Sequence, residues 1–152
     1  MLNKTKLLHE LTSSLQPVQR AWKRAVGKVI ADYGISMSLT TVIVLIHRNS
    51  QGMNQKLLAD EMGINPGALV RLVDQASSEA YIERRCEPGD RRSKILHILP
   101  KGKKLAVEIE QLADELRLEL MKDVEPELIH KVSEVLRLFE KRANEYTNSA
   151  EN

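Results

Sequence analysis

One change in the spacing of apolar residues constrains the fold of this chain more than any other feature. Apolar side chains recur every three or four residues over 7–33 and again over 105–139, which is the spacing of amphipathic helices. Between these stretches, residues 81–86 and 93–99 have the composition of two short strands, and residues 87–90, Glu-Pro-Gly-Asp, have the chemistry of a turn. We therefore expect a mainly α-helical chain with one small β-hairpin.

Capping signals place three helices before the hairpin. Ser36 is a good N-cap for a helix over residues 37–48, and Asn54 for a short helix over 55–62 that Gly63 ends. Asn65 followed by Pro66 starts a third helix, because proline suits the first helical position. We expect the third helix to run to about Ala80. The second and third helices, joined by a three-residue turn, form a helix-turn-helix pattern.

Apolar positions in these two helices are expected to face inward. In the short helix they are Leu57, Leu58, Ala59 and Met62, and in the third helix Leu69, Leu72, Val73 and Ala76.

Prolines and glycines punctuate the remaining helices. Pro17 lies inside the first helical stretch, where it either kinks the helix or starts it anew. Gly34 is expected to end that stretch. Pro100 and Gly102 are expected to lie in the segment before the next helix, and Pro126 divides the last two helices.

Apolar stripes at the two ends of the chain exceed what one small domain can cover by itself. They comprise Leu7, Leu11 and Leu15 near the N-terminus, and Leu128, Val132, Val135 and Phe139 near the C-terminus. We expect a second copy of the chain to cover them, which makes the protein a homodimer.

The chain has a net charge of only +2, but its charges are unevenly distributed. Residues 84–104 hold eight basic and two acidic side chains, a net charge of +6, whereas residues 108–152 have a net charge of −6. The basic block either contacts a polyanion or forms a solvated basic surface loop. Charge alone does not separate these two interpretations.

Several classes of protein are disfavoured by the sequence. The longest apolar run, residues 42–46, is far too short to span a bilayer, and the N-terminus shows no secretory signal, so we expect a cytoplasmic protein. Cys86 is the single cysteine, and the four histidines are widely spaced, so we expect no metal site. No nucleotide-binding or catalytic motif is present, so we expect no enzyme activity and no cofactor.

The order of these elements resembles the MarR family of winged-helix transcription regulators, over nearly the whole chain. Residues 57–64 look like the first helix of the family's helix-turn-helix, and residues 69–75 like its recognition helix, especially in the SlyA branch. Asp90-Arg91-Arg92 looks like the family's motif at the wing tip. Ala80 stands where the family frequently has a glycine. The resemblance implies a winged helix-turn-helix flanked by N- and C-terminal dimerisation helices.

The recognition helix and the wing supply the candidate DNA-binding residues. The Arg71 guanidinium matches the O6 and N7 acceptors of guanine in the major groove, whereas the alternative is a surface arginine that pairs with Asp74 or Gln75. Arg92 is placed to enter a narrow minor groove with Asp90 holding its guanidinium, and the alternative is a turn with solvated charges. Further candidates are Asn65, Gly67 and Val70 at the helix opening, and Arg84, Arg85, Arg91 and Lys94 as phosphate contacts.

Two other features have less specific interpretations. Cys86 either senses peroxide, because neighbouring arginines favour a thiolate, or is incidental, which we favour because related oxidation sensors place the cysteine near the N-terminal helix. Family resemblance also implies a small aromatic or anionic ligand between the dimerisation helices and the DNA-binding unit, with Trp22, Ser38 and Thr41 as lining residues.

The sequence therefore predicts a homodimeric, sequence-specific DNA-binding regulator in a single domain over residues 1–152. Residues 36–104 form the winged helix-turn-helix, and residues 1–35 and 105–147 the dimerisation helices. The expected partners are double-stranded DNA and a second copy. The alternative is a protein-interaction module whose basic wing docks an acidic partner protein without binding DNA.

Overall fold

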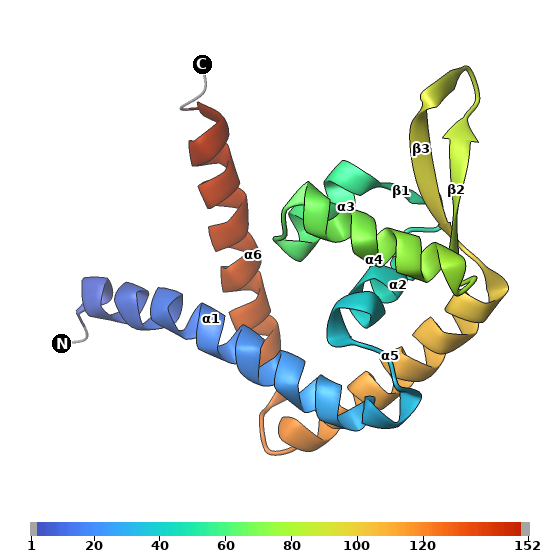
Figure 1. Ribbon diagram of the computed structural model, residues 1–152. Helices are drawn as coiled ribbons and strands as arrows, with labels where there is room; N and C mark the ends of the chain where they lie inside the picture. The colour runs from blue at the N-terminus through green and yellow to red at the C-terminus, as the bar shows by residue number, and fades with distance from the viewer. Residues whose placement is uncertain (1–2, 150–152) are drawn as a thin grey trace. The chain divides into compact units, whose positions relative to one another are not determined.

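A computed structural model describes residues 3–149 of the chain (Figure 1). The outermost residues of the predicted single domain, 1–2 and 150–152, lie outside this range. In chain order the elements are α1 (Lys4–Val29), the 3₁₀ helix η1 (Ala31–Tyr33), α2 (Met37–Arg48), β1 (Met53–Asn54), α3 (Gln55–Met62), α4 (Pro66–Ser78), β2 (Ile82–Glu87), β3 (Asp90–Ile98), α5 (Pro100–Leu120) and α6 (Pro126–Ser149). Mainly helical structure with a small antiparallel sheet is the winged-helix fold predicted from the sequence.

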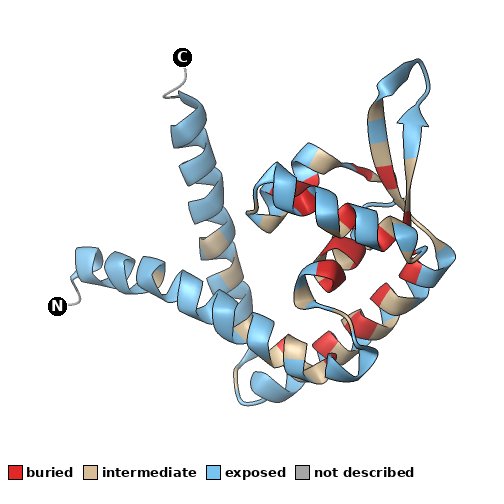
Figure 2. Cartoon of the chain, viewed as in Figure 1, coloured by how far each residue is buried: buried red, intermediate tan, exposed pale blue. Residues whose placement is uncertain are grey.

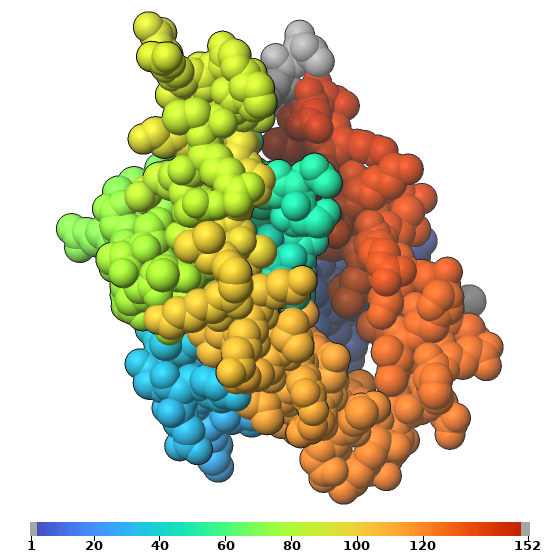
Figure 3. All heavy atoms as spheres, turned by 90° about the vertical axis from the view of Figure 1, so that its right-hand side faces the viewer, coloured from blue at the N-terminus to red at the C-terminus, as the bar shows by residue number. Residues whose placement is uncertain are grey.

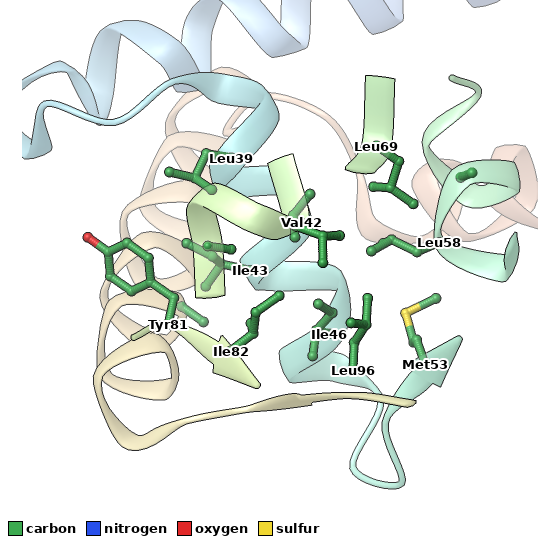
Figure 4. Close-up of a cluster of buried hydrophobic side chains, with 14 residues drawn as sticks. Leu39, Val42, Ile43, Ile46, Met53, Leu58, Leu69, Tyr81, Ile82 and Leu96 are labelled. Carbon is green, nitrogen blue, oxygen red and sulfur yellow. The ribbon is translucent and has the colours of Figure 1, made fainter. Parts of the chain in front are cut away.

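The main core lies where α2, α3, α4, the sheet and α5 meet. Side chains from all of these elements are buried together, as Figure 4 shows. The helix α2 contributes more of them than any other element, since its run of Val, Ile and Leu packs on α4 and on β3. The buried residues include Leu39, Val42, Ile43, Ile46, Leu58, Leu69, Val73, Ile82, Leu96 and Ala106.

The predicted helix starts are confirmed by their capping hydrogen bonds. The Ser36 hydroxyl accepts from the N–H of Leu39 at 3.1 Å. The Asn54 side chain accepts from Leu57 at 2.7 Å, and the Asn65 side chain accepts from Ala68 at 2.8 Å. Each of these side chains satisfies an N–H group that the first turn of a helix leaves without a partner.

The sheet has three antiparallel strands in the order β1-β3-β2. The hairpin of β2 and β3 was predicted, although β3 begins at Asp90 rather than at residue 93. The two-residue strand β1, which places Met53 opposite Leu96, was not predicted. A strand this short carries no periodicity of its own and forms only because β3 offers a free edge.

Three other details differ from the sequence-based expectations. Leu57 is 45% exposed, because an eight-residue helix has one inward face and Leu58 and Ala59 occupy it. The helix α4 ends at Ser78, and Ala80 has a left-handed backbone with φ +59°. Pro100 and Gly102 lie within α5 rather than before it.

The start of α5 packs directly on the end of α4. A Cβ on Gly102 would lie 2.2 Å from the carbonyl oxygen of Tyr81, so only glycine permits this contact. The Lys101 ammonium donates to the carbonyl of Glu79 at 2.7 Å and lies 4.4 Å from the centre of the Tyr81 ring. The lysine thus caps α4 and makes a cation–π contact at the same point.

The helix α1 continues through Pro17 from Lys4 to Val29, so the proline does not divide it. Its C-terminal part packs on α5 through a second cluster of Val26, Ile30 and Ile109, with Trp22 against it. Gly34, at φ 65°, follows the 3₁₀ helix and ends the stretch as predicted.

The chain divides into two compact units, residues 1–116 and 117–152. In the described part of the second unit, residues 117–149, no side chain is buried, and α6 shows no buried residue in Figure 2. Apolar side chains are exposed there instead, among them Leu128 (55%), Val132 (47%), Val135 (50%) and Phe139 (41%). Among residues 3–149, no helix has the length and apolarity that a membrane crossing requires.

Candidate nucleic-acid interface

The opening of α4 presents its candidate residues to solvent. Asn65, Gly67 and Val70 are all exposed, and the carbonyl oxygen of the Asn65 side chain is occupied as the cap of the helix. The first turn of a helix carries N–H groups without intrahelical partners and the positive end of the helix dipole. This end of α4 therefore suits the approach of a phosphate group.

Arg71 is exposed on α4 and makes no hydrogen bond or ion pair with any residue that the structure describes. The pairing considered as its alternative role is not formed. Asp74 pairs with Arg84, and the Gln75 amide donates to Glu79 at 2.9 Å. The Arg71 guanidinium therefore keeps all of its donors available for a ligand.

The wing tip is a tight turn at Pro88-Gly89 followed by an irregular start of β3. Gly89 has φ +89°, and the register of β2 and β3 shifts between Cys86 and Glu87. Atoms of the wing project beyond α4 and the start of α5 in the space-filling view (Figure 3).

Three basic side chains lie exposed along this irregular segment, those of Arg91, Arg92 and Lys94. The carboxylate of Asp90 accepts a hydrogen bond from the main-chain N–H of Arg92 at 2.8 Å, and the structure gives it no bond to the Arg92 guanidinium. The expected guanidinium contact is therefore replaced by a turn stabilised through the backbone, which is the usual role of Asp two residues before an N–H.

The two neighbouring arginines of β2 differ in environment. Arg85 is exposed and pairs with Glu83 on its own strand. Arg84 is half-buried and contacts α4 and α3 through Asp74 and Gln55. Sequence reasoning grouped Arg84 and Arg85 as phosphate contacts, although the alternation of side chains along β2 distinguishes them.

The exposed Cys86 donates a weak hydrogen bond to the carbonyl of Arg91, with 3.8 Å between the atoms.

A cavity of about 330 Å³ lies between α1, α2 and the turn of the helix-turn-helix. Two of the predicted lining residues, Ser38 and Thr41, lie on its wall. The lining residues are Lys23 and Arg24 of α1, Met37, Ser38 and Thr41 of α2, and Met62 and Ile64 on either side of Gly63.

Trp22 does not line this cavity. It lies one helical turn before Val26 and therefore packs with it in the second cluster. Lys23 and Arg24 form a basic wall of the cavity, and sequence reasoning missed both residues. The combination of two cations, two hydroxyls and apolar side chains suits an amphipathic anion.

Comparison with known proteins relates the central part of the chain to one family. Residues 35–94, which include α2, the helix-turn-helix and most of the wing, match the sequence profile of the MarR family. Similar solved structures share the fold over most of both chains.

Three of these structures illustrate the likeness, and two of them are described as MarR transcriptional regulators. CouR of Rhodococcus jostii RHA1, solved with p-coumaroyl-CoA, has a TM-score of 0.74 and 24% identity over 84% of this chain and 89% of that one. A MarR transcriptional regulator of Methanosarcina mazei Go1 has a TM-score of 0.77 and 23% identity, and the match covers 90% of this chain and 98% of that one. A MarR family regulator of Listeria monocytogenes, solved with a 26mer DNA, has a TM-score of 0.77 and 17% identity. The match covers 86% of this chain and 87% of that one.

Proposed function

Residues 35–94 belong to the MarR family, and on that premise we propose that this chain is a homodimeric, sequence-specific DNA-binding transcription regulator. In this proposal α4 enters the major groove of an operator, and the wing enters the flanking minor groove. Cognate DNA is a near-palindrome, because two copies of one helix related by a two-fold axis read the same half-site twice.

The observation that carries the proposal is the presence of two exposed basic elements in one compact unit. Arg71 on α4 and Arg92 on the wing are both exposed and have no ion-pair partner among the described residues. A guanidinium fork reads guanine in the major groove, and an inserted arginine responds to a narrow minor groove. Arg91 and Lys94 add positive charge beside the wing for phosphate contacts.

The proposed dimer rests on the exposed apolar side chains at both ends of the chain. Leu7 is 43% exposed and Leu15 is 38% exposed on α1, and α6 buries none of its residues within one chain. Apolar faces of this extent in a small chain are expected to be covered by another protein surface. We assign residues 1–35 and 105–147 to this interface, and residues 36–104 to the DNA-binding unit.

We also propose that the cavity beside Lys23 and Arg24 binds a small anionic ligand. Ser38 and Thr41 supply hydroxyl groups, and Met37, Met62 and Ile64 supply an apolar wall. The Thr41 hydroxyl donates to the Met37 carbonyl at 2.8 Å and keeps its own lone pairs for a ligand donor. That CouR is solved with an acyl-CoA thioester is consistent with an anionic ligand for this fold.

A selection experiment tests the DNA proposal. The full chain is mixed with a pool of random duplexes at about 0.15 M salt, and bound DNA is amplified and sequenced over several rounds. We expect enrichment of a near-palindrome with half-site centres about 10 base pairs apart. Retention of all duplexes without enrichment would contradict the proposal and favour the alternative, a basic wing that docks an acidic protein.

A further inference from the structure

Arg84 lies on the inner face of the wing sheet, unlike Arg85 beside it on the same strand. It pairs in register with Leu96, which is fully buried, and it is two residues from Ile82, which is 1% exposed. Side chains two apart on a strand point to the same face. The Arg84 side chain, at 26% relative exposure, therefore extends over the core side of β2 rather than toward solvent.

From this position Arg84 joins three elements. Its Nη2 donates to the Asp74 carboxylate of α4 at 2.5 Å, and its Nε lies 3.4 Å from the side-chain oxygen of Gln55 in α3. One guanidinium thus contacts the proposed recognition helix, the helix before it and the base of the wing. Figure 1 shows β2 beginning near the end of α4, and the two elements are in contact.

Arg85 provides a natural contrast within the same strand. It carries the same charge and is also ion-paired, but its partner Glu83 lies on β2 itself, and its side chain is 57% exposed. The Arg85 pair therefore fixes no element relative to another. Loss of the Arg84 contacts, and not of the Arg85 contact, removes a link between the wing and α4.

We propose that Arg84 is a positioning residue that fixes the direction of the wing relative to the recognition helix through Asp74 and Gln55. This inference rests on the proposed function, because it explains how reading of a major groove and of the flanking minor groove is kept in register. A guanidinium is suited to this role since its planar fork holds two acceptors at a fixed angle.

Substitution of Asp74 distinguishes the positioning role from a simple effect of charge on DNA binding. It lies three residues after Arg71, so the two side chains share one face of α4. Simple electrostatics predicts that Asp74→Asn removes a negative charge near DNA phosphates and tightens binding to every duplex. The positioning role predicts instead that Asp74→Asn weakens the preference for the correct flanking sequence.

The first test uses the free protein. Cys86 is the only cysteine of the chain and is exposed on the wing, so a nitroxide label there reports wing motion. We expect Arg84→Gln and Asp74→Asn each to increase label mobility in the electron paramagnetic resonance spectrum. The double variant should show no further increase over Arg84→Gln, because that change already removes the contact between Arg84 and Asp74. Arg85→Gln is the matched control and should leave the spectrum unchanged.

The second test uses the duplex selected by the wild-type protein and a duplex whose flanks are scrambled. We expect Arg84→Gln and Asp74→Asn to reduce discrimination between the two duplexes about three- to tenfold. The Arg85→Gln control should retain discrimination even if total affinity falls with the lost charge. Arg84→Lys, which keeps the charge without the fork, should reduce discrimination in part.

Three results would overturn or separate the claims. Unchanged label mobility and unchanged discrimination in both Asp74→Asn and Arg84→Gln would refute the positioning role. Tighter binding of Asp74→Asn to both duplexes alike would show that Asp74 acts by charge alone, which also refutes it. A wild-type protein that selects no sequence would refute the proposed function, and label mobility would still decide whether Arg84 holds the wing.

Discussion

The Asp90 carboxylate accepts a hydrogen bond from the main-chain N–H of Arg92, 2.8 Å away, at the tip of the wing. This bond orders the backbone from which the Arg92 side chain projects. It also places a negative charge within two residues of the proposed minor-groove contact, where charge alone would oppose DNA.

The Asp90–Arg92 bond predicts opposite results for two substitutions at Asp90. Asp90→Asn keeps the oxygen acceptor and removes the charge, so DNA affinity should be unchanged or higher. Asp90→Ala removes both, and we expect operator affinity to fall about 3- to 10-fold. Arg92→Ala should cause a larger loss. Fluorescence anisotropy with the selected operator measures all three, and equal affinities for Asp90→Asn and Asp90→Ala would show that the backbone bond does not matter.

The unpaired guanidinium of Arg71 predicts a loss of specificity on substitution. Arg71→Ala should weaken binding to the operator by about 1–3 kcal/mol per half-site and leave binding to scrambled DNA nearly unchanged. Arg71→Lys retains the charge but not the two-donor fork, so it should lose specificity with little change in nonspecific affinity. Equal losses on operator and scrambled DNA for Arg71→Ala would identify a phosphate contact instead.

The left-handed backbone at Ala80 predicts a stabilising substitution. An L-residue with φ +59° is strained, whereas glycine adopts this conformation freely. We expect Ala80→Gly to raise the free energy of unfolding by about 0.5–1 kcal/mol after the larger entropy of the unfolded glycine chain is counted. Urea denaturation measures this, and Glu79→Gly, at φ −86°, is the control that should destabilise.

Replacing two helical glycines with alanine should change the stability of the fold in opposite directions. Gly102→Ala would place a methyl group against the Tyr81 carbonyl and should destabilise the fold by about 1–3 kcal/mol. Gly27 lies inside α1, and apart from the adjoining backbone of that helix no atom lies within 4 Å of the place a Cβ would take. Gly27→Ala should therefore stabilise by up to about 1 kcal/mol. Thermal unfolding of both variants checks the pair, and a neutral Gly102→Ala would mean that α5 can shift.

The exposed apolar face of α6 predicts the oligomeric state. The double variant Val132→Asp/Val135→Asp should convert the dimer to a monomer, which light scattering after size exclusion measures. It should also abolish operator binding, which fluorescence anisotropy measures. Leu57→Asp is the control, because Leu57 is 45% exposed on α3, close to the 47% of Val132, but lies outside the proposed interface. Deletion of residues 127–152 should give monomer or aggregate, and a deleted chain that stays a soluble dimer would place the interface elsewhere.

Local chemistry explains which parts of the fold were predictable. The caps Ser36, Asn54 and Asn65 act within three residues, so the sequence around each is sufficient to locate a helix start. The strand β1 depends on a partner about forty residues away, and no local pattern reveals it. The close contact of Gly102 with Tyr81 likewise depends on how α5 meets α4, which spacing along the chain does not encode.

The candidate site was predictable in composition and less so in geometry. Arg71 and Arg92 are exposed, as their positions on a helix and at a turn suggest. The environment of Arg84 depends on the register of β2 with β3, which places it opposite Leu96. The basic wall of the cavity depends on the packing of α1 beside α2, so Lys23 and Arg24 were not anticipated.

The position of the cavity has a thermodynamic consequence. Its apolar wall includes Met62 and Ile64, which flank the glycine that ends α3 and lie within three residues of the cap of α4. If a ligand there lowers operator affinity by some factor, operator DNA must lower ligand affinity by the same factor, because the two equilibria form a closed cycle. Free protein is then the form that captures the ligand, and DNA-bound protein is the form that resists it.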